Sequence, residues 1–548
     1  MEVARFDAST YAISARGFNH STGTANKLQV SIDGRAVYSP LYSGVFWDEQ
    51  DVPLADVDRI EVISGPGGTL WGTNAVNGVI NIITRHSRDT QGALVDVTGG
   101  SLDDNVTLRY GGKVGEKTTY RIYAMGTERG ALLTRSGSDA NDAWQKLQGG
   151  FRADWASGED DATLQGDIYR GVSDELAGSV QSGVIDGGNI LGRWNRAFSD
   201  NSAFQVQLYY DSATRKTTSG VTSTVDTYDL DTQYSFSAGM WNAIVFGGGY
   251  RVTDDNFVRG PGTAFLDPAQ RTLQKLNGFL QDEIALADAL TLTLGVKIEN
   301  NAYTGTEYMP DARIAWRLSD TDLLWAAVSR AVRTPARFDR DLINPGLLAG
   351  GPNFESEDLL AYEAGYRGQP SRATSFSLSL FYNVYDHLRT VEASTPVVFP
   401  LVVRNGMKGE TYGVELWGNY ALTPCWRLSA GVSTLHKDLR LVAGSRDIFG
   451  VLFAGNDPAY QASLRSQMDV ADNVALDVEL RAVDGLKSPR IPGYAEADTR
   501  LGWRVTESVE LSLTGSNLLH NRHAEFQNAA VPLQEIPRSI TASARWRF

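Results

Sequence analysis

Residues 56–85, DVDRIEVISGPGGTLWGTNAVNGVINIITR, are the stretch from which the rest of the chain can be interpreted. Two short apolar segments, residues 60–63 and 79–83, are predicted to be strands because β-branched side chains favour strands. The loop between them carries five glycines, which permit positive φ angles and close backbone approach. A phosphate-binding loop is disfavoured because the stretch contains no lysine. A hairpin-like connection in a soluble domain stays open.

Two further motifs precede this stretch, ISARGFN at residues 13–19 and VSIDGR at residues 30–35. Together with RIEVISGPGGTLWGTNAVNGVINIITR, and in this order, they resemble the plug domain of TonB-dependent outer-membrane receptors. The resemblance implies an α+β plug over residues 1–88, held inside the lumen of a transmembrane β-barrel over residues 89–548.

The composition restricts the class of protein. The chain has 548 residues with 50 basic and 65 acidic side chains, and its net charge of −15 argues against nucleic acid as a partner. The single cysteine, Cys425, excludes an internal disulfide and a cysteine-based metal site. No apolar run approaches the roughly 20 residues of a membrane helix. A membrane protein of this sequence must therefore be a closed barrel.

Period-two alternation dominates from about residue 92 to the end. In residues 290–299 five aliphatic side chains share one face and polar side chains share the other, and residues 375–382 and 474–480 alternate similarly. Such segments last about ten residues, the length of a tilted membrane strand. We count about 22 of them, with short and long connections in alternation, as in plugged bacterial barrels. A soluble propeller or β-helix would need a repeat of fixed period, which we do not find.

Aromatic residues support the same interpretation. Ten of the 12 tryptophans fall in or beside the candidate strands, which fits interfacial girdles, although core tryptophans would give a similar count. The last segment, residues 539–548, alternates and ends on Phe548. It resembles the C-terminal signature that the barrel assembly machinery reads, and it implies contact with outer-membrane lipid and lipopolysaccharide.

Catalytic motifs are weak, and we predict no enzyme, no metal site and no cofactor. His520 and His523 form an H-x-x-H that is better explained as a solvated turn than as a metal pair. No Ser-His-acid set can be argued from the sequence. Three acidic turns are most simply solvated, with cation binding as the alternative: Asp103-Asp104, Glu159-Asp160-Asp161 and Asp254-Asp255.

The resemblance implies that the upper loops of the plug contact a ligand. The predicted contacts are Arg5, Phe6, Tyr11, Tyr38, Tyr42, Phe46 and Trp47. The alternative is that these side chains only pack the plug against the barrel wall.

A lock between plug and barrel is the second implication for individual residues. Plugs of the family carry two arginines that face two barrel glutamates, and Arg16, Glu363 and Glu415 match three of these positions. The second arginine would fall at Ser64, so we expect at least one glutamate to need another partner.

The resemblance further implies active import of a scarce nutrient, energised by TonB. A ferric siderophore is the first expectation, and cobalamin, other metal complexes and glycans are alternatives. Six methionines and six histidines give copper no support. The TonB-binding box, the first part of the plug and a signal peptide are absent from this sequence, so TonB is expected to bind a segment outside it. Rival hypotheses are a passive substrate-specific porin, which would lack a plug, and an enzyme or adhesin acting through its loops.

Overall fold

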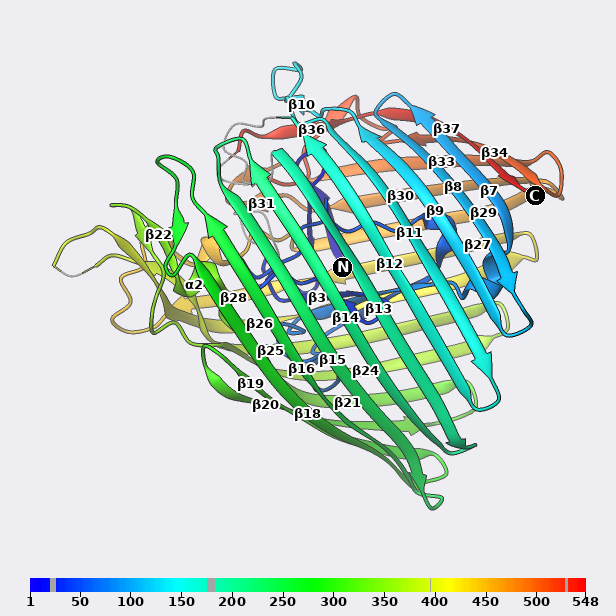
Figure 1. The fold of residues 1–548 in the computed structure, drawn as a ribbon, viewed down its shortest axis with the longest axis horizontal. Coiled ribbons are helices and arrows are strands. Elements are labelled where there is room, and N and C mark those ends of the chain that lie inside the picture. Colours follow the sequence, from blue (N-terminus) through cyan, green and yellow to red (C-terminus); the bar gives the residue numbers. More distant parts are fainter. Residues whose placement is uncertain (20–25, 175–182, 395, 528–530) are drawn as a thin grey trace.

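The computed structural model describes residues 1–19, 26–174, 183–394, 396–527 and 531–548. Its dominant feature is a closed barrel of tilted strands that surrounds the N-terminal segments, drawn in dark blue (Figure 1). The barrel has 22 long antiparallel strands when β27 and β28 are counted as two halves of one strand and the short loop strands β17, β22 and β23 are left out. The predicted 22-stranded barrel with its plug is confirmed.

The barrel strands have the following bounds: β7 (Gly92–Gly100), β8 (Asp103–Val114), β9 (Thr118–Arg129), β11 (Trp144–Ser157), β12 (Asp160–Ser173), β13 (Gly183–Ser199), β14 (Ser202–Thr217), β15 (Thr222–Ala238), β16 (Asn242–Val258), β18 (Gln270–Ala287), β19 (Leu290–Asn301), β20 (Gly305–Arg317), β21 (Asp322–Arg333), β24 (Glu357–Ser371), β25 (Thr374–Glu392), β26 (Leu401–Thr423), β27 (Trp426–Thr434), β28 (His436–Leu441), β29 (Tyr460–Ala471), β30 (Val474–Val483), β33 (Tyr494–Arg504), β34 (Val509–Ser516) and β37 (Ser539–Arg547).

Short elements lie in the long loops. They are β10 (Leu133–Thr134), β17 (Phe265–Leu266), α2 (Arg337–Arg340), β22 (Leu342–Asn344), β23 (Leu348–Ala349), η3 (Val451–Ala454), β31 (Leu486–Lys487), β32 (Arg490–Ile491), β35 (Arg522–His523) and β36 (Gln534–Pro537). Within the described ranges, no helix is long and apolar enough to cross a membrane.

The first and last strands complete the cylinder. Strand β37 pairs antiparallel with β7, from Thr541 opposite Gly100 to Arg547 opposite Leu94. Since every long strand has two neighbours, the wall has no free edge, and its backbone groups are satisfied inside lipid.

The alternation in residues 290–299 sorts side chains between the two faces of the wall. Leu294 and Ile298 of β19 are 43% and 46% exposed, whereas Lys297 and Glu299 of the same strand are buried in the lumen. Among the predicted interfacial tryptophans, Trp316 is 53% exposed beside a short turn. Apolar side chains thus face lipid and polar ones face the plug.

The plug occupies the lumen. Strands β1 (Glu2–Arg5) and β2 (Tyr11–Ser14) form a hairpin, and a four-stranded sheet has the order β4-β3-β6-β5. The sheet strands are β3 (Leu28–Ile32), β4 (Arg35–Ala36), β5 (Val57–Ser64) and β6 (Gly78–Thr84), and the short helices are η1 (Leu54–Asp56), α1 (Gly68–Trp71) and η2 (Ser87–Thr90). The two strands predicted at residues 60–63 and 79–83 are present within β5 and β6. Val30 and Ile80 lie in the apolar core of this sheet.

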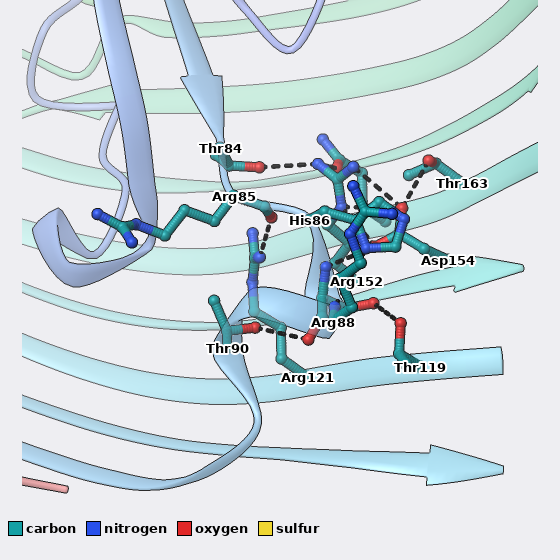
Figure 2. A network of polar contacts seen from close by, with 12 residues as sticks. Thr84, Arg85, His86, Arg88, Thr90, Thr119, Arg121, Arg152, Asp154 and Thr163 are labelled. Carbon is teal, nitrogen blue, oxygen red and sulfur yellow. Dashed lines mark hydrogen bonds and ion pairs between the residues drawn. The ribbon is translucent and has the colours of Figure 1, made fainter.

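A polar network fixes the chain where it leaves the plug for the wall (Figure 2). Arg152 Nη1 donates to Thr84 Oγ1 at 3.0 Å, and the Ser87 amide donates to Asp154 Oδ2 at 2.8 Å. Arg152 and Asp154 both belong to β11 and pair with each other at 2.9 Å. The linker is therefore tied to the wall before the first barrel strand begins.

Candidate functional site

The predicted ion pairs of Arg16 are present, and we call them the first anchor. Arg16 Nη1 lies 2.7 Å from Glu363 Oε1 of β24, and Arg16 Nη2 lies 3.1 Å from Glu415 Oε2 of β26. Burial alone would lower the pKa of Arg16, but the two carboxylates raise it above its ordinary value. The guanidinium also lies 4.3 Å from the ring centre of Phe381. A function of these contacts as a lock stays a prediction.

The expectation that one glutamate needs another partner is wrong, because a single guanidinium contacts both. The neighbouring Gly65 makes this approach possible. Its φ is +94°, and a Cβ atom there would lie 2.6 Å from Glu363 Oε1 and 2.9 Å from Arg16 Nη1. Part of the glycine-rich loop is therefore explained by the space that the ion pairs need.

A second anchor, which the sequence did not reveal, has the opposite charges. Asp56 of the plug is 1% exposed, and its Oδ1 lies 2.5 Å from Arg109 Nη1 of β8. Its Oδ2 lies 3.3 Å from Arg121 Nε of β9. One plug carboxylate thus meets two wall cations, where one plug cation meets two wall carboxylates in the first anchor.

Further ion pairs join the plug to the wall. Arg215 Nη2 of β14 lies 2.8 Å from Asp48 Oδ1 and 2.9 Å from Glu49 Oε1. Burial raises the pKa of Glu49 to about 7, although Arg215 opposes this. Lys27 forms a buried ion pair with Glu357 of β24. Burial lowers the pKa of Lys27, and Glu357 opposes the shift.

A cavity of about 620 Å³ separates the plug sheet from strands β13 to β19. Its wall carries charges that neutralise one another across neighbouring strands. Arg251 Nε lies 2.7 Å from Asp229 Oδ2, and Lys275 Nζ lies 3.3 Å from Glu299 Oε2. Amide side chains share this lining: Gln205, Gln207, Gln233, Gln274 and Asn277 of the wall, and Gln29 and Asn81 of the plug. The cavity is therefore polar and close to neutral.

The cavity reaches Tyr303, in the turn between β19 and β20. Two guanidinium groups flank its ring, since the Cζ atoms of Arg271 and Arg340 lie 4.7 and 5.4 Å from the ring centre. The Tyr303 hydroxyl donates to Asp341 Oδ2 at 2.7 Å. Burial and Asp341 raise the pKa of Tyr303, so the hydroxyl stays protonated. Cations over an aromatic ring suit a ligand that is anionic and aromatic.

The first group of predicted ligand contacts lies away from this cavity. Phe6 is buried and packs on Phe526, with ring centres 6.2 Å apart. Arg5 Nη2 donates to the Ala8 carbonyl at 2.9 Å, and Arg5 Cζ lies 5.9 Å from the ring centre of Tyr11. These three side chains do not line the cavity, and their ligand contacts remain a prediction.

The second group is closer to the cavity, but only Tyr38 lines it. The rings of Tyr42 and Phe46 are 4.4 Å apart, and Arg215 Cζ lies 4.3 Å from the ring centre of Phe46. Trp47 is half-buried against the core of the plug sheet. The structure therefore brings Tyr42 and Phe46 together, whereas ligand contact at all four positions remains a prediction.

His520 is exposed, as expected for a solvated turn, but His523 is buried. His520 Nδ1 and His523 Nδ1 lie 2.7 and 3.4 Å from the same oxygen of the buried Glu496, and His523 is only 8% exposed. Its Nε2 lies 3.0 Å from Glu525, whose other oxygen accepts from the Arg5 amide. Over the described parts of the chain, no group of three or more His, Cys, Asp or Glu side chains is arranged to hold a metal.

One acidic turn also needs correction. Asp255 lies in strand β16, is buried, and its Oδ1 is 2.6 Å from Arg337 Nη1, so it is not a solvated turn residue. Asp103 pairs with Arg129 at 2.9 Å. Neither position needs a bound cation for its charge to be balanced.

Sequence reasoning missed the three residues of the Tyr303 cluster. Arg271 lies at the start of β18, Arg340 lies in α2, and Tyr303 lies in the turn between β19 and β20. No spacing in the sequence links these three positions. Lys297 and Glu299, by contrast, belong to the polar face of the alternation in residues 290–299, which already indicated that they face the lumen.

Comparison with known proteins agrees with this architecture. The family model "TonB dependent receptor-like, beta-barrel" matches residues 98–518, and "TonB-dependent Receptor Plug Domain" matches residues 3–79. The vitamin B12 transporter of Vibrio vulnificus is 23% identical over 72% of this chain and 64% of its own length. The iron-regulated outer membrane virulence protein of Vibrio cholerae is 22% identical over 70% of this chain and 63% of its own length. The matched chain thus spans a little under two thirds of these relatives.

A ferric enterobactin receptor of Pseudomonas aeruginosa has the same fold, with a TM-score of 0.80 at 15% identity, over 100% of this chain and 94% of the other. The Vibrio vulnificus relative is named a transporter and the solved structure a receptor. The barrel family model alone covers more than half of the chain. This chain therefore belongs to the TonB-dependent receptors, the plugged β-barrels of the bacterial outer membrane.

Proposed function

We propose that this receptor captures a ferric siderophore outside the cell and imports it with energy supplied through TonB. The observation that carries the choice of cargo is the Arg271–Tyr303–Arg340 cluster, of which Tyr303 lines the lumenal cavity. A ferric catecholate is both anionic and aromatic, so guanidinium groups and a tyrosine ring can bind it through charge and ring contacts at once. The names of the iron-regulated relative and of the solved receptor point the same way.

Cobalamin is the second candidate, because the cavity wall is rich in amides. Gln207, Gln233 and Asn277 can each donate and accept hydrogen bonds. Such a lining complements a ligand that itself carries many amide groups. The vitamin B12 transporter among the relatives supports this alternative.

The remaining assignments are part of the same proposal. The plug would end near residue 88, where the linker is tied to β11, and the barrel would follow. TonB would be the partner that supplies the energy for import. Outer-membrane lipid and lipopolysaccharide would contact the barrel exterior, and the assembly machinery would read the C-terminal strand through Phe548, which is 64% exposed. We assign no catalytic role.

Growth on single nutrient sources tests the proposal. A strain lacking its own receptor regains the full-length gene and is grown with ferric enterobactin as the only iron source, or with cyanocobalamin as the only cobalt source. We expect iron-dependent growth. Growth restored by cyanocobalamin alone would instead support the second candidate.

Binding by variants tests the cluster itself. Substituting Arg271→Ala together with Arg340→Ala should weaken ferric enterobactin binding about tenfold or more, since each cation–π contact contributes about 1 kcal/mol. Arg259→Ala is the matched control, because Arg259 stacks on Phe265 and not on Tyr303. Equal losses in both variants would contradict the assignment.

A further inference from the structure

The plug is attached to the wall unevenly around the barrel. The first anchor holds it to β24 and β26, and the second holds it to β8 and β9. Between described residues, no hydrogen bond or ion pair joins the plug to β15, β16 or β18, which we call the open sector. Contact there consists of the plug helix α1, which lies beside β18, and an apolar cluster in which Leu41 meets Phe257 of β16 and Leu266.

The cavity fills this open sector. Along β15 it extends from Thr227 to Gln233, six residues or about 20 Å of strand. Its plug side is lined by residues such as Leu70, Trp71 and Asn74, which a ferric siderophore moving along this wall would meet. Passage of such a cargo needs the plug to withdraw further from this side.

We infer that imported cargo passes between the plug and the open sector while the plug stays attached at the first and second anchors. This inference rests on the proposed function, since it describes the route of the imported metal complex. It requires movement of the plug surface beside the cavity and not departure of the whole plug.

On the β14 margin of the cavity the plug is held by the ion pair of Arg35 with Asp211. The attachments on the opposite margin, at β19 and β20, are of a kind that can be released. Thr73 Oγ1 donates to Glu299 Oε1 at 2.5 Å, Thr69 Oγ1 donates to the Met309 carbonyl at 3.2 Å, and Lys297 Nζ donates to the Leu70 carbonyl at 3.2 Å. None of these three contacts joins a plug cation to a wall carboxylate or the reverse. A hydrogen bond to a hydroxyl or carbonyl is replaced by water more readily than a buried ion pair, whose separation leaves an unpaired charge.

The wall of the open sector also suits passage. Its charges are paired between adjacent strands, as Arg251 is with Asp229, so they present little net field to the lumen. Its amide side chains offer a moving solute many weak hydrogen bonds, one after another along the wall. A solute moves along a wall when each site binds it enough for entry but too weakly to retain it.

Chemical modification after assembly tests the route without disturbing folding. In a Cys425→Ser background, Gln233→Cys places a thiol in the cavity on β15. Ser463→Cys is the matched control on β29, since Ser463 shares a face of the sheet with Arg481, which contacts Glu525 inside the barrel, and lies outside the cavity. Cells producing each variant are treated with methanethiosulfonate reagents of increasing size, and the extent of modification is read from the intact mass.

Binding and uptake of radio-iron-labelled enterobactin are then measured, or of labelled cyanocobalamin if only that compound binds. We expect modified Gln233→Cys to bind the probe normally but to import it at least tenfold more slowly, with recovery after reduction. Modified Ser463→Cys should change uptake less than twofold. Unchanged uptake by modified Gln233→Cys, or an equal block at Ser463→Cys, would overturn the route. If the unmodified receptor did not bind the probe, the assigned cargo would be wrong. That result would concern the proposed function and not the route.

Discussion

The plug meets the barrel wall in two different ways. On the sides of β8–β9 and β24–β26 it is joined by buried ion pairs, whereas on the open sector the two surfaces are separated by a polar cavity. Separating a buried ion pair costs free energy because it leaves an unpaired charge where little water can solvate it. Surfaces that already contact water separate at little free-energy cost. The difference suggests that the structure specifies which side of the plug stays in place and which side can move.

The two anchors are also opposite to each other in charge. The first sets one plug cation against two wall carboxylates, and the second sets one plug carboxylate against two wall cations. If the plug were docked with these sides exchanged, Arg16 would face Arg109 and Arg121, and Asp56 would face glutamates. Like charges at close range are strongly unfavourable. We therefore expect the anchors to fix the orientation of the plug as well as its attachment.

The largest effect is expected when the first anchor is removed. Arg16→Ala leaves Glu363 and Glu415 near each other without a cation, which should weaken plug docking by about 3–5 kcal/mol. Hydrogen exchange of the amides of β3 and β6 measures this loss. Arg16→Lys is the control, because it keeps the charge but cannot contact both glutamates in the same geometry. Its amide protection should lie between that of the wild type and that of Arg16→Ala. Wild-type protection in Arg16→Ala would show that the ion pairs do not hold the plug.

Breaking the second anchor should have a smaller effect. Asp56→Asn removes the charge but keeps an acceptor for Arg109, so we expect a loss of about 2 kcal/mol in the same exchange measurement. Arg121 keeps a second acceptor, the carbonyl of Arg85, which limits the loss further. A loss larger than that of Arg16→Ala would reverse the order of the two anchors.

The pH dependence of docking tests a third attachment, at the N-terminal hairpin. Burial and the nearby Asp457 raise the pKa of Glu2 to about 8, from an ordinary value of 4.5, and Lys437 only partly opposes this. The folded state therefore holds a proton that the unfolded state releases. The stabilisation is complete below pH 4.5 and is lost as the pH rises through about 8.

The protection factors of the β1 and β2 amides, which correct for base-catalysed intrinsic exchange, should thus fall as the pH rises from 5 to 7 and 9. Glu2→Gln is the matched control, because a neutral amide in the same place cannot titrate and should reduce this fall. Burial also raises the pKa of Asp7 to about 6, which contributes in the same direction over a lower pH range. Protection factors in the wild type that stay constant or rise between pH 5 and 9 would contradict this explanation.

The sequence predicted the barrel well because its signal is local. Alternation in residues 290–299 already separates lipid-facing Leu294 from lumenal Lys297, and no knowledge of the neighbouring strands is needed. The anchors are different, because they depend on which lumenal side chains of the wall lie at the same level along the barrel axis as a given plug residue. Asp56 belongs to the stretch that suggested the fold, yet its partners Arg109 and Arg121 could be found only from strand register and plug position.

Loops were the least predictable part. His523 was expected to be solvated, but it packs between Glu496 and Glu525, and nothing in residues 520–538 alternates in a way that reveals burial. The Tyr303 cluster likewise combines a turn and the start of a strand with a long loop, whose path depends on contacts with distant strands. Periodicity carries information about strands and very little about the loops between them.

The smallest effect on plug docking is expected from a substitution in the open sector. Thr227→Ala removes a cavity-lining hydroxyl that contacts no plug residue through a hydrogen bond in the described chain. Its effect on plug docking should stay within about 0.5 kcal/mol, as for other solvated positions away from packed features. The same exchange experiment measures it, with Arg16→Ala as the reference for a large loss. If Thr227→Ala weakened docking as much as an anchor substitution, the cavity wall would be supporting the plug, and no side of the plug could be regarded as free to move.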